Sequence, residues 1–206
     1  MDEGQVKAAV LTRVREANGR RRKPIVTAEF TLGSSGVRAD LAVFAETTIG
    51  FEIKTAKDTL RRLPGQMEAY ARYFDHAVAV VAPCHVPHIA PRLLHGGSLW
   101  TYDDEGVLHP LLEGRVNIVD HQALMDVMTQ AERREGNFRA AIASRYETTS
   151  RQFWAAVARR PIRSSDLPLL SRFHEARMQA RRLAAEREAQ WGQWRAAQGG
   201  LALAST

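Results

Sequence analysis

The chain has 206 residues, 45% of them hydrophobic and 25% charged, which is the balance of an ordinary globular protein. This length fits one domain with appendages or two small domains. The single cysteine, Cys84, excludes an intrachain disulfide framework and a cysteine-ligated zinc or iron–sulfur site. The chain opens without an apolar signal core and has no apolar run of membrane-spanning length. We therefore expect a cytoplasmic protein that has no membrane partner.

The positive charge is concentrated in the last third of the chain, which has a net charge of +6 as a whole. Residues 1–130 contain 15 Lys+Arg and 16 Asp+Glu, a net charge of −1. Residues 131–206 contain 14 Lys+Arg and 7 Asp+Glu, a net charge of +7. An excess of basic residues favours an acidic partner, and we expect nucleic acid, DNA first, before any other.

The N-terminal part predicts a helix followed by three short strands. Apolar residues recur at helical spacing over 2–18. Alternating residues then predict strands at 25–32, 38–44 and 49–55, and the short turns between them predict an antiparallel meander. In the first strand, strict alternation places Val26, Ala28, Phe30 and Leu32 on one face and Ile25, Thr27, Glu29 and Thr31 on the other.

The middle of the chain predicts a second helix and three further strands. Residues 58–74 have a helical apolar stripe, with Asp58 as its expected N-cap and Pro64 as a break or a first-turn proline. The further strands are expected at 77–82, 98–102 and 106–112. The first of these is continuously apolar, which is typical of a strand buried on both faces.

The C-terminal part predicts helices. Amphipathic stretches cover 119–135 and 137–159, and Asp166 is expected to cap a long final helix with Pro168 in its first turn. Arginines follow this final helix at positions 172, 177, 181, 182, 187 and 195. Three interpretations stay open: a helix folded on its own core, an arm that contacts DNA phosphates, and a helix that packs on a second copy or a protein partner.

Three ionisable residues in the predicted meander form a candidate catalytic site. Alternation puts Glu52 and Lys54 on one face of their strand. A hairpin centred near residue 46 puts Asp40 opposite Glu52. Like charges in that position destabilise a hairpin, and a divalent cation would offset the repulsion. Carboxylate and carbonyl oxygens suit Mg²⁺, and a lysine beside them can orient an attacking water, so the pattern indicates phosphodiester cleavage.

The order helix, three-stranded meander, helix and buried strand, together with Asp40 and Glu52-Ile53-Lys54, resembles the PD-(D/E)XK nuclease superfamily. The resemblance implies a restriction-endonuclease-like α/β core over residues 1–115, followed by an Arg-rich helical region over 116–206. It also implies Mg²⁺ or Mn²⁺ as cofactor, held by Asp40, Glu52 and the backbone carbonyl of Ile53.

Gln66 and Tyr70 resemble the Gln-x-x-x-Tyr motif of the RecB-like branch, which implies that both side chains face the substrate strand. The chain departs from the superfamily pattern at Ala39, where the namesake proline is absent. The superfamily often has one more acidic residue near the metal. Glu29 is the preferred candidate here, with Glu3 or Glu16 of the first helix as alternatives.

The sequence therefore predicts a metal-dependent deoxyribonuclease with Asp40, Glu52 and Lys54 as its catalytic residues. Some proteins of similar local sequence are bacterial or phage proteins described in DNA repair, which implies a role in repair, phage or mobile-element biology. The alternative is a nuclease-like module that binds nucleic acid or a protein with little or no catalysis.

Overall fold

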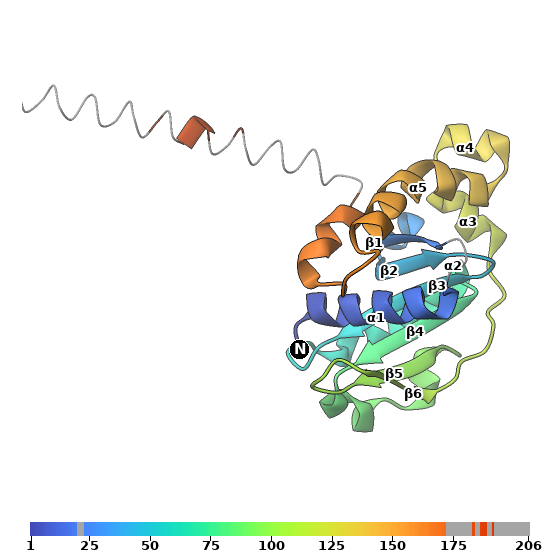
Figure 1. Cartoon of the computed structure of the whole chain (residues 1–206). Coiled ribbons are helices and arrows are strands. Elements are labelled where there is room, and N and C mark those ends of the chain that lie inside the picture. The colour runs from blue at the N-terminus through green and yellow to red at the C-terminus, as the bar shows by residue number, and fades with distance from the viewer. Residues whose placement is uncertain (20–22, 172–182, 184–185, 189–190, 192–206) are drawn as a thin grey trace, which may run out of the picture. The chain divides into compact units, whose positions relative to one another are not determined.

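The computed structural model describes residues 1–19, 23–171, 183, 186–188 and 191. The chain forms two units, Met1–Ser171 and Arg172–Thr206. The first unit is a mixed α/β fold around one six-stranded sheet (Figure 1). It continues well past residue 115, the boundary expected from the sequence, because the helices that follow share its core.

The strands follow one another across the sheet in the order in which they occur in the chain. They are β1 (Ile25–Thr31), β2 (Arg38–Phe44), β3 (Thr48–Lys54), β4 (His76–Val81), β5 (Ser98–Tyr102) and β6 (Leu108–Leu112). Strands β1, β2 and β3 are antiparallel, which confirms the predicted meander. Strands β3, β4 and β5 are parallel, and β5 and β6 form an antiparallel pair. Short 3-10 turns join the elements: η1 (Gly33–Ser35), η2 (Leu60–Arg62), η3 (Pro83–His88), η4 (Pro91–Leu94) and η5 (Ser164–Leu170).

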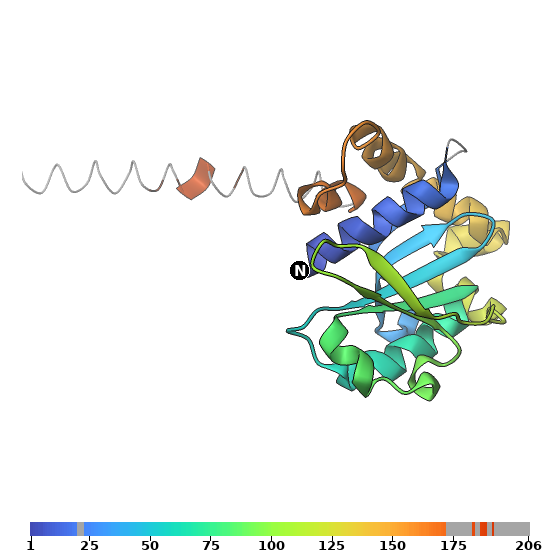
Figure 2. The same cartoon turned by 60° about the horizontal axis from the view of Figure 1, so that its bottom comes forward.

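Helices cover both faces of the sheet, as Figure 2 shows. Helix α1 (Glu3–Asn18) packs on one face through Val6, Val10, Leu11 and Val14. Helix α2 (Leu63–Tyr73) packs on the other face through Leu63, Met67, Tyr70 and Tyr73. Strand β4 is buried on both faces, as its continuous apolar sequence predicted. The sheet therefore separates two apolar cores.

Helix α2 begins at Leu63, five residues later than the expected start at residue 58, and η2 precedes it. Pro64 lies in the first turn of the helix, as one of the two predicted alternatives. Asp58, however, does not cap α2. Its carboxylate accepts hydrogen bonds from the backbone N–H and the hydroxyl of Thr55, at 2.8 and 2.6 Å, and so closes the turn that follows β3.

The alternation of β1 breaks at Glu29, which the sequence pattern did not reveal. Val26 and Ala28 face the core under α1, whereas Phe30 lies in the core under α2. Glu29 has a φ of 58°, in the left-handed region that non-glycine residues seldom adopt. This backbone conformation reverses the face that the following side chains occupy.

Among the described residues up to Ser171, the helical region is more broken than expected. The predicted helix 119–135 is two helices, α3 (His121–Val127) and α4 (Gln130–Glu135), because Thr129 forms a capping box that starts the second. Helix α5 (Phe138–Ala156) matches the expected 137–159 more closely. Asp166 does not cap a long helix; it lies within η5 and binds Arg160 at 2.7 Å.

Helix α5 and η5 cover the outer edge of β1. The backbone N–H of Val26 donates to the Ser150 hydroxyl at 3.0 Å, and the Trp154 indole donates to the Pro24 carbonyl at 2.9 Å. The hydroxyl of Thr27 donates to the Leu170 carbonyl at 3.3 Å. These contacts supply the partners that an edge strand otherwise lacks.

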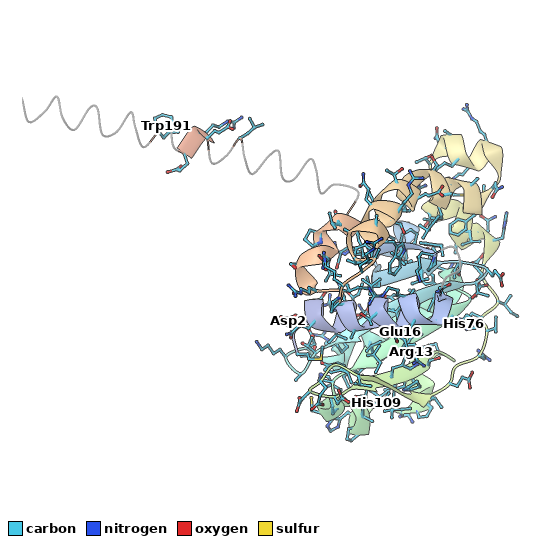
Figure 3. All side chains as sticks on the ribbon, viewed as in Figure 1. Asp2, Arg13, Glu16, His76, His109 and Trp191 are labelled. Carbon is cyan, nitrogen blue, oxygen red and sulfur yellow. The ribbon has the colours of Figure 1, made fainter. Side chains whose placement is uncertain are left out.

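Few residues of the second unit are described. Leu183, Glu186–Glu188 and Trp191 are helical, and the side chain of Trp191, labelled in Figure 3, is exposed. Apart from Arg187, the arginines named for the final helix lie outside the described residues, so the three interpretations of that helix stay predictions. Among the described residues, no helix is long and apolar enough to cross a membrane.

Candidate active site

The hairpin of β2 and β3 brings Asp40 beside Glu52. Leu41 pairs with Phe51 at the last paired position of the hairpin, and Asp40 and Glu52 are the two residues that adjoin this pair. The backbone N–H of Ile53 donates to Asp40 Oδ2 at 2.7 Å. This bond fixes the Asp40 carboxylate at the end of the hairpin.

Glu52 and Lys54 form a buried pair beneath Asp40. Their side chains are 2% and 6% exposed, and Lys54 Nζ lies 2.5 Å from Glu52 Oε1. The Tyr70 hydroxyl donates to the other oxygen, Glu52 Oε2, at 2.6 Å. Both oxygens of Glu52 are therefore held by hydrogen-bond donors, which a buried carboxylate requires.

Burial, and next the negative charge of Glu52, raise the pKa of Asp40 to about 7. Lys7 and the Ile53 N–H act in the opposite direction. The positive charge beside Asp40 is therefore too small to keep the pKa of Asp40 in its ordinary range. Such a site gains from a further cation.

Asp40 also belongs to a second group of charged residues, centred on Lys7 of α1. We call this group the Lys7 cluster; it consists of Glu3, Lys7, Glu29 and Asp40. Lys7 Nζ lies 2.6 Å from Glu3 Oε1, 2.5 Å from Glu29 Oε1 and 3.9 Å from Asp40 Oδ1. Burial alone would lower the pKa of Lys7, but the hydrogen bonds to Glu29 and Glu3 raise it above its ordinary value. Arg38 Nε holds the other Glu29 oxygen at 2.6 Å.

The Lys7 cluster contains the additional acidic residues that the sequence led us to expect beside Asp40. Both Glu29 and Glu3 lie there, and the three acids are the one group of this kind among the described residues whose oxygens lie close enough, within 4.8 Å, to share a cation. Glu16 instead lines a separate cavity of about 690 Å³ beside Arg13, and Figure 3 labels both. Sequence reasoning missed Lys7, although the spacing Glu3-x-x-x-Lys7 on one helix face was a usable signal.

Gln66 and Tyr70 lie at different depths, although they are one helical turn apart. Gln66 borders the cleft, and its Oε1 is buried without a hydrogen-bond partner among the described residues. Tyr70 is fully buried in the core, and its hydroxyl contacts Glu52 rather than the cleft. Burial, and next the charge of Glu52, raise the pKa of Tyr70 well above its usual range, so its hydroxyl stays a donor.

Apart from Tyr70, which is buried beneath it, the residues predicted to form the site line one cleft of about 930 Å³. Asp40, Glu52, Ile53 and Lys54 line it together with Glu3, Glu29 and Gln66. Three arginines also line the cleft: Arg38 at the start of β2, and Arg61 and Arg62 on η2. An acidic centre with cationic side chains around it is suited to a phosphate-containing ligand that binds through a metal ion.

Three further side chains with reactive or polar groups do not line this cleft. Cys84 is exposed on η3. The His85 ring lies 2.9 Å from the Thr55 carbonyl, in contact with the turn that follows β3. Lys57 is exposed to solvent.

Comparison with known proteins gives a family and one structural neighbour. Among curated proteins, no relative matches the sequence. A solved structure of a protein of unknown function from Silicibacter pomeroyi is similar, with 14% identity and a TM-score of 0.48 over 77% of this chain and 94% of that one. The family model described as "Bacteriophage P4 protein cII" matches residues 1–135, which include α1, the whole sheet and every residue of the cleft. Since this match spans well over half of the sequence, the chain belongs to the bacteriophage P4 protein cII family.

Proposed function

We propose that the protein is a metal-dependent nuclease of the PD-(D/E)XK type, which hydrolyses phosphodiester bonds in DNA. The observation that carries the proposal is the convergence of Asp40, Glu52 and Lys54 on one cleft. Its membership of a phage protein family supports a role in phage or mobile-element biology.

The residues of the site fit a hard divalent cation. Mg²⁺ prefers oxygen ligands, and Asp40, Glu52 and the carbonyl of Ile53 offer such a set at the end of one hairpin. Burial, and next the charge of Glu52, raise the pKa of Asp40, and a bound cation would offset both effects. When bound, Mg²⁺ or Mn²⁺ would supply a Lewis acid for the phosphoryl oxygen and lower the pKa of a water.

The protein's own side chains have distinct roles in this proposal. Lys54 orients the attacking water and stabilises negative charge on the phosphate, and its ammonium is positioned by Glu52. The Tyr70 hydroxyl holds the Glu52 carboxylate in place through a hydrogen bond from the core side of the site. The Ile53 N–H fixes Asp40. Each reacting group is thus held by a neighbour that does not itself react.

The rim of the cleft supports nucleic acid as the substrate. Arg61 and Arg62 are exposed and line the cleft from η2, so they are placed to contact backbone phosphates. Gln66 lines the same cleft, so its side-chain amide lies close to the position expected for the substrate.

The test is cleavage of labelled single-stranded, double-stranded and branched DNA, and of RNA, with Mg²⁺ or Mn²⁺. We expect metal-dependent cleavage by the wild type, a loss of at least about 100-fold in Lys54→Met and Asp40→Asn, and no change in the exposed control Lys57→Met. If wild type and Lys54→Met are equally inactive on every substrate, the nuclease proposal fails.

One observation favours a second candidate, a module that binds DNA without cleaving it. Lys54 is already paired with Glu52, and Lys7 already neutralises the acids beside Asp40. A site whose charged groups are already paired with one another can bind the phosphate backbone of DNA through the arginines at its rim alone. Tight DNA binding by wild type and Lys54→Met, with no cleavage by either, would select this candidate.

A further inference from the structure

Lys7 is a buried charged residue that the proposed reaction does not use. Its side chain is 7% exposed, and its ammonium lies between carboxylates from α1, β1 and β2. An ammonium has three N–H donors, and three acidic oxygens surround this one at 2.6, 2.5 and 3.9 Å. The cluster therefore holds a positive charge that the protein supplies itself.

The backbone of β1 is distorted where it contributes to this arrangement. Glu29 has a φ of 58°, a conformation that costs about 1–3 kcal/mol for a residue with a side chain. Its two oxygens are taken by Lys7 at 2.5 Å and by Arg38 at 2.6 Å. Charge pairing on both oxygens accounts for the stability of an otherwise unfavourable backbone.

The same three acids have the spacing of a cation site. One oxygen from each of Glu3, Glu29 and Asp40 lies within 4.8 Å of the others, and Lys7 Nζ is the positive group that contacts all three. A second positive ion at this position would meet the ammonium at short range and be repelled by it. Asp40 Oδ1 faces this side, while Oδ2 accepts from the Ile53 N–H.

We propose that Lys7 is a resident cation: its ammonium fills the position beside Asp40 that a second metal ion would take, and so confines a divalent ion to the Glu52 side of Asp40. Lys7 is then a positioning residue for the cleavage site, and that site works with one metal ion. This inference rests on the proposed function in one respect: it assumes that one divalent ion binds at Asp40 and Glu52. The effect of Lys7 does not depend on cleavage.

The test is to count Mn²⁺ ions bound by the full chain, using electron paramagnetic resonance of free Mn²⁺ and calorimetric titration. Lys7→Met should bind one Mn²⁺ more than the wild type, because the three acids lose their ammonium. Lys7→Arg, which keeps the charge, should bind the wild-type number. The double variant Lys7→Met with Glu3→Gln should lose the additional ion. Lys23→Met is the control, since Lys23 contacts backbone carbonyls at the end of α1 and not carboxylates.

The result that overturns the proposal is an equal number of ions in Lys7→Met and wild type. Two ions in the wild type would overturn it as well. No ion in the wild type and one in Lys7→Met would uphold the role of Lys7 while counting against the metal-dependent nuclease. The two proposals can thus fail separately.

A thermal measurement covers the case in which Lys7→Met is poorly folded. If a bound ion replaces the ammonium, Mn²⁺ should raise the Tm of Lys7→Met by more than it raises the wild-type Tm. A variant that is destabilised and gains no more from Mn²⁺ than the wild type would show that Lys7 acts only as a packing residue.

Discussion

Tyr70 contacts Glu52, one of the proposed catalytic residues. Its hydroxyl is buried and donates to Glu52 Oε2 at 2.6 Å. Tyr70→Phe removes that donor and leaves the ring in the core. We expect cleavage and Mn²⁺ affinity to fall about 10- to 100-fold, the usual effect of removing a residue that orients a metal ligand. Cleavage kinetics and calorimetric titration measure the two effects.

The matched control is Tyr73→Phe on the same helix, since the Tyr73 hydroxyl interacts with Ser35 and not with Glu52. Unchanged cleavage and metal affinity in Tyr70→Phe would show that Lys54 alone holds Glu52 in place.

At the residue scale, the candidate site was predictable where it depended on local geometry. Asp40, Glu52 and Lys54 follow from strand alternation and a two-strand register, and both are local properties of the chain. Lys7 was not predictable in this way, because α1 crosses the sheet and brings it to Asp40 from 33 positions away in the sequence. The conformation of Glu29 could not be predicted for another reason. Alternation of side chains assumes an extended backbone, and the backbone of Glu29 is not extended.

At the element scale, the ion pair of Glu132 and Arg145 joins α4 to α5. Arg145 Nε donates to Glu132 Oε1 at 2.7 Å, and the Arg145 side chain also binds the second oxygen. The hydrogen bonds from Arg145 lower the pKa of Glu132 to about 2. A carboxyl whose pKa is lower in the folded state stabilises the protein above its unfolded pKa and loses that effect as the pH falls through the folded pKa.

We therefore expect Glu132→Gln to lower the Tm at pH 7 by about 2–4 °C, the shift for about 1 kcal/mol in a domain of this size. The difference from wild type should shrink below pH 4.5 and vanish only below about pH 2. Calorimetric scans across this range measure it. A Tm difference that stayed constant with pH would assign the effect to packing instead.

The turn η2 carries the two arginines at the rim of the cleft. If Arg61 and Arg62 bind phosphates, each alanine substitution should weaken DNA binding at low salt for all sequences alike. It should also reduce the slope of log affinity against log salt by about 0.7–0.9 for each phosphate that is no longer neutralised. Fluorescence anisotropy in Ca²⁺, without cleavage, measures both quantities.

Arg92→Ala is the control, because Arg92 is exposed on η4 and does not line the cleft. An unchanged slope in both η2 variants, or an equally weakened affinity in Arg92→Ala, would show that these arginines do not bind the substrate.

Element boundaries were predictable where a single residue decides them locally. Pro64 lies in the first turn of α2, one of the two positions expected for it, because its ring is tolerated there. Asp58 does not cap the helix, because its carboxylate accepts hydrogen bonds from the backbone N–H and the hydroxyl of Thr55. The break between α3 and α4 was hidden by an apolar pattern that continues across Thr129, although the capping box that Thr129 forms with Glu132 was a usable signal.

At the scale of the whole molecule, the described core lies within residues 1–171. The buried apolar residues of both clusters end at Leu170. We therefore expect a chain that ends at Ser171 to unfold at the Tm of the full chain and to keep metal-dependent cleavage. Calorimetry and the cleavage assay measure these properties.

This truncation also separates the three interpretations of the C-terminal helix. A lower Tm would mean that residues 172–206 pack on the core. A weaker and less salt-dependent affinity for DNA at unchanged Tm would mean that they act as a basic arm. A change in mass by light scattering would mean that they join two copies.

The order of the strands has a consequence for synthesis of the protein. Because the sheet is laid down from β1 to β6 in chain order, the ribosome can release the hairpin with Asp40, Glu52 and Lys54 before most of the chain exists. The outer edge of β1 stays uncovered for longer, since Ser150 and Trp154 of α5 are synthesised only after the sixth strand. The nascent protein thus has the hairpin of the candidate site beside an uncovered strand edge, which other chains can pair with until α5, which follows the family-matched segment, covers it.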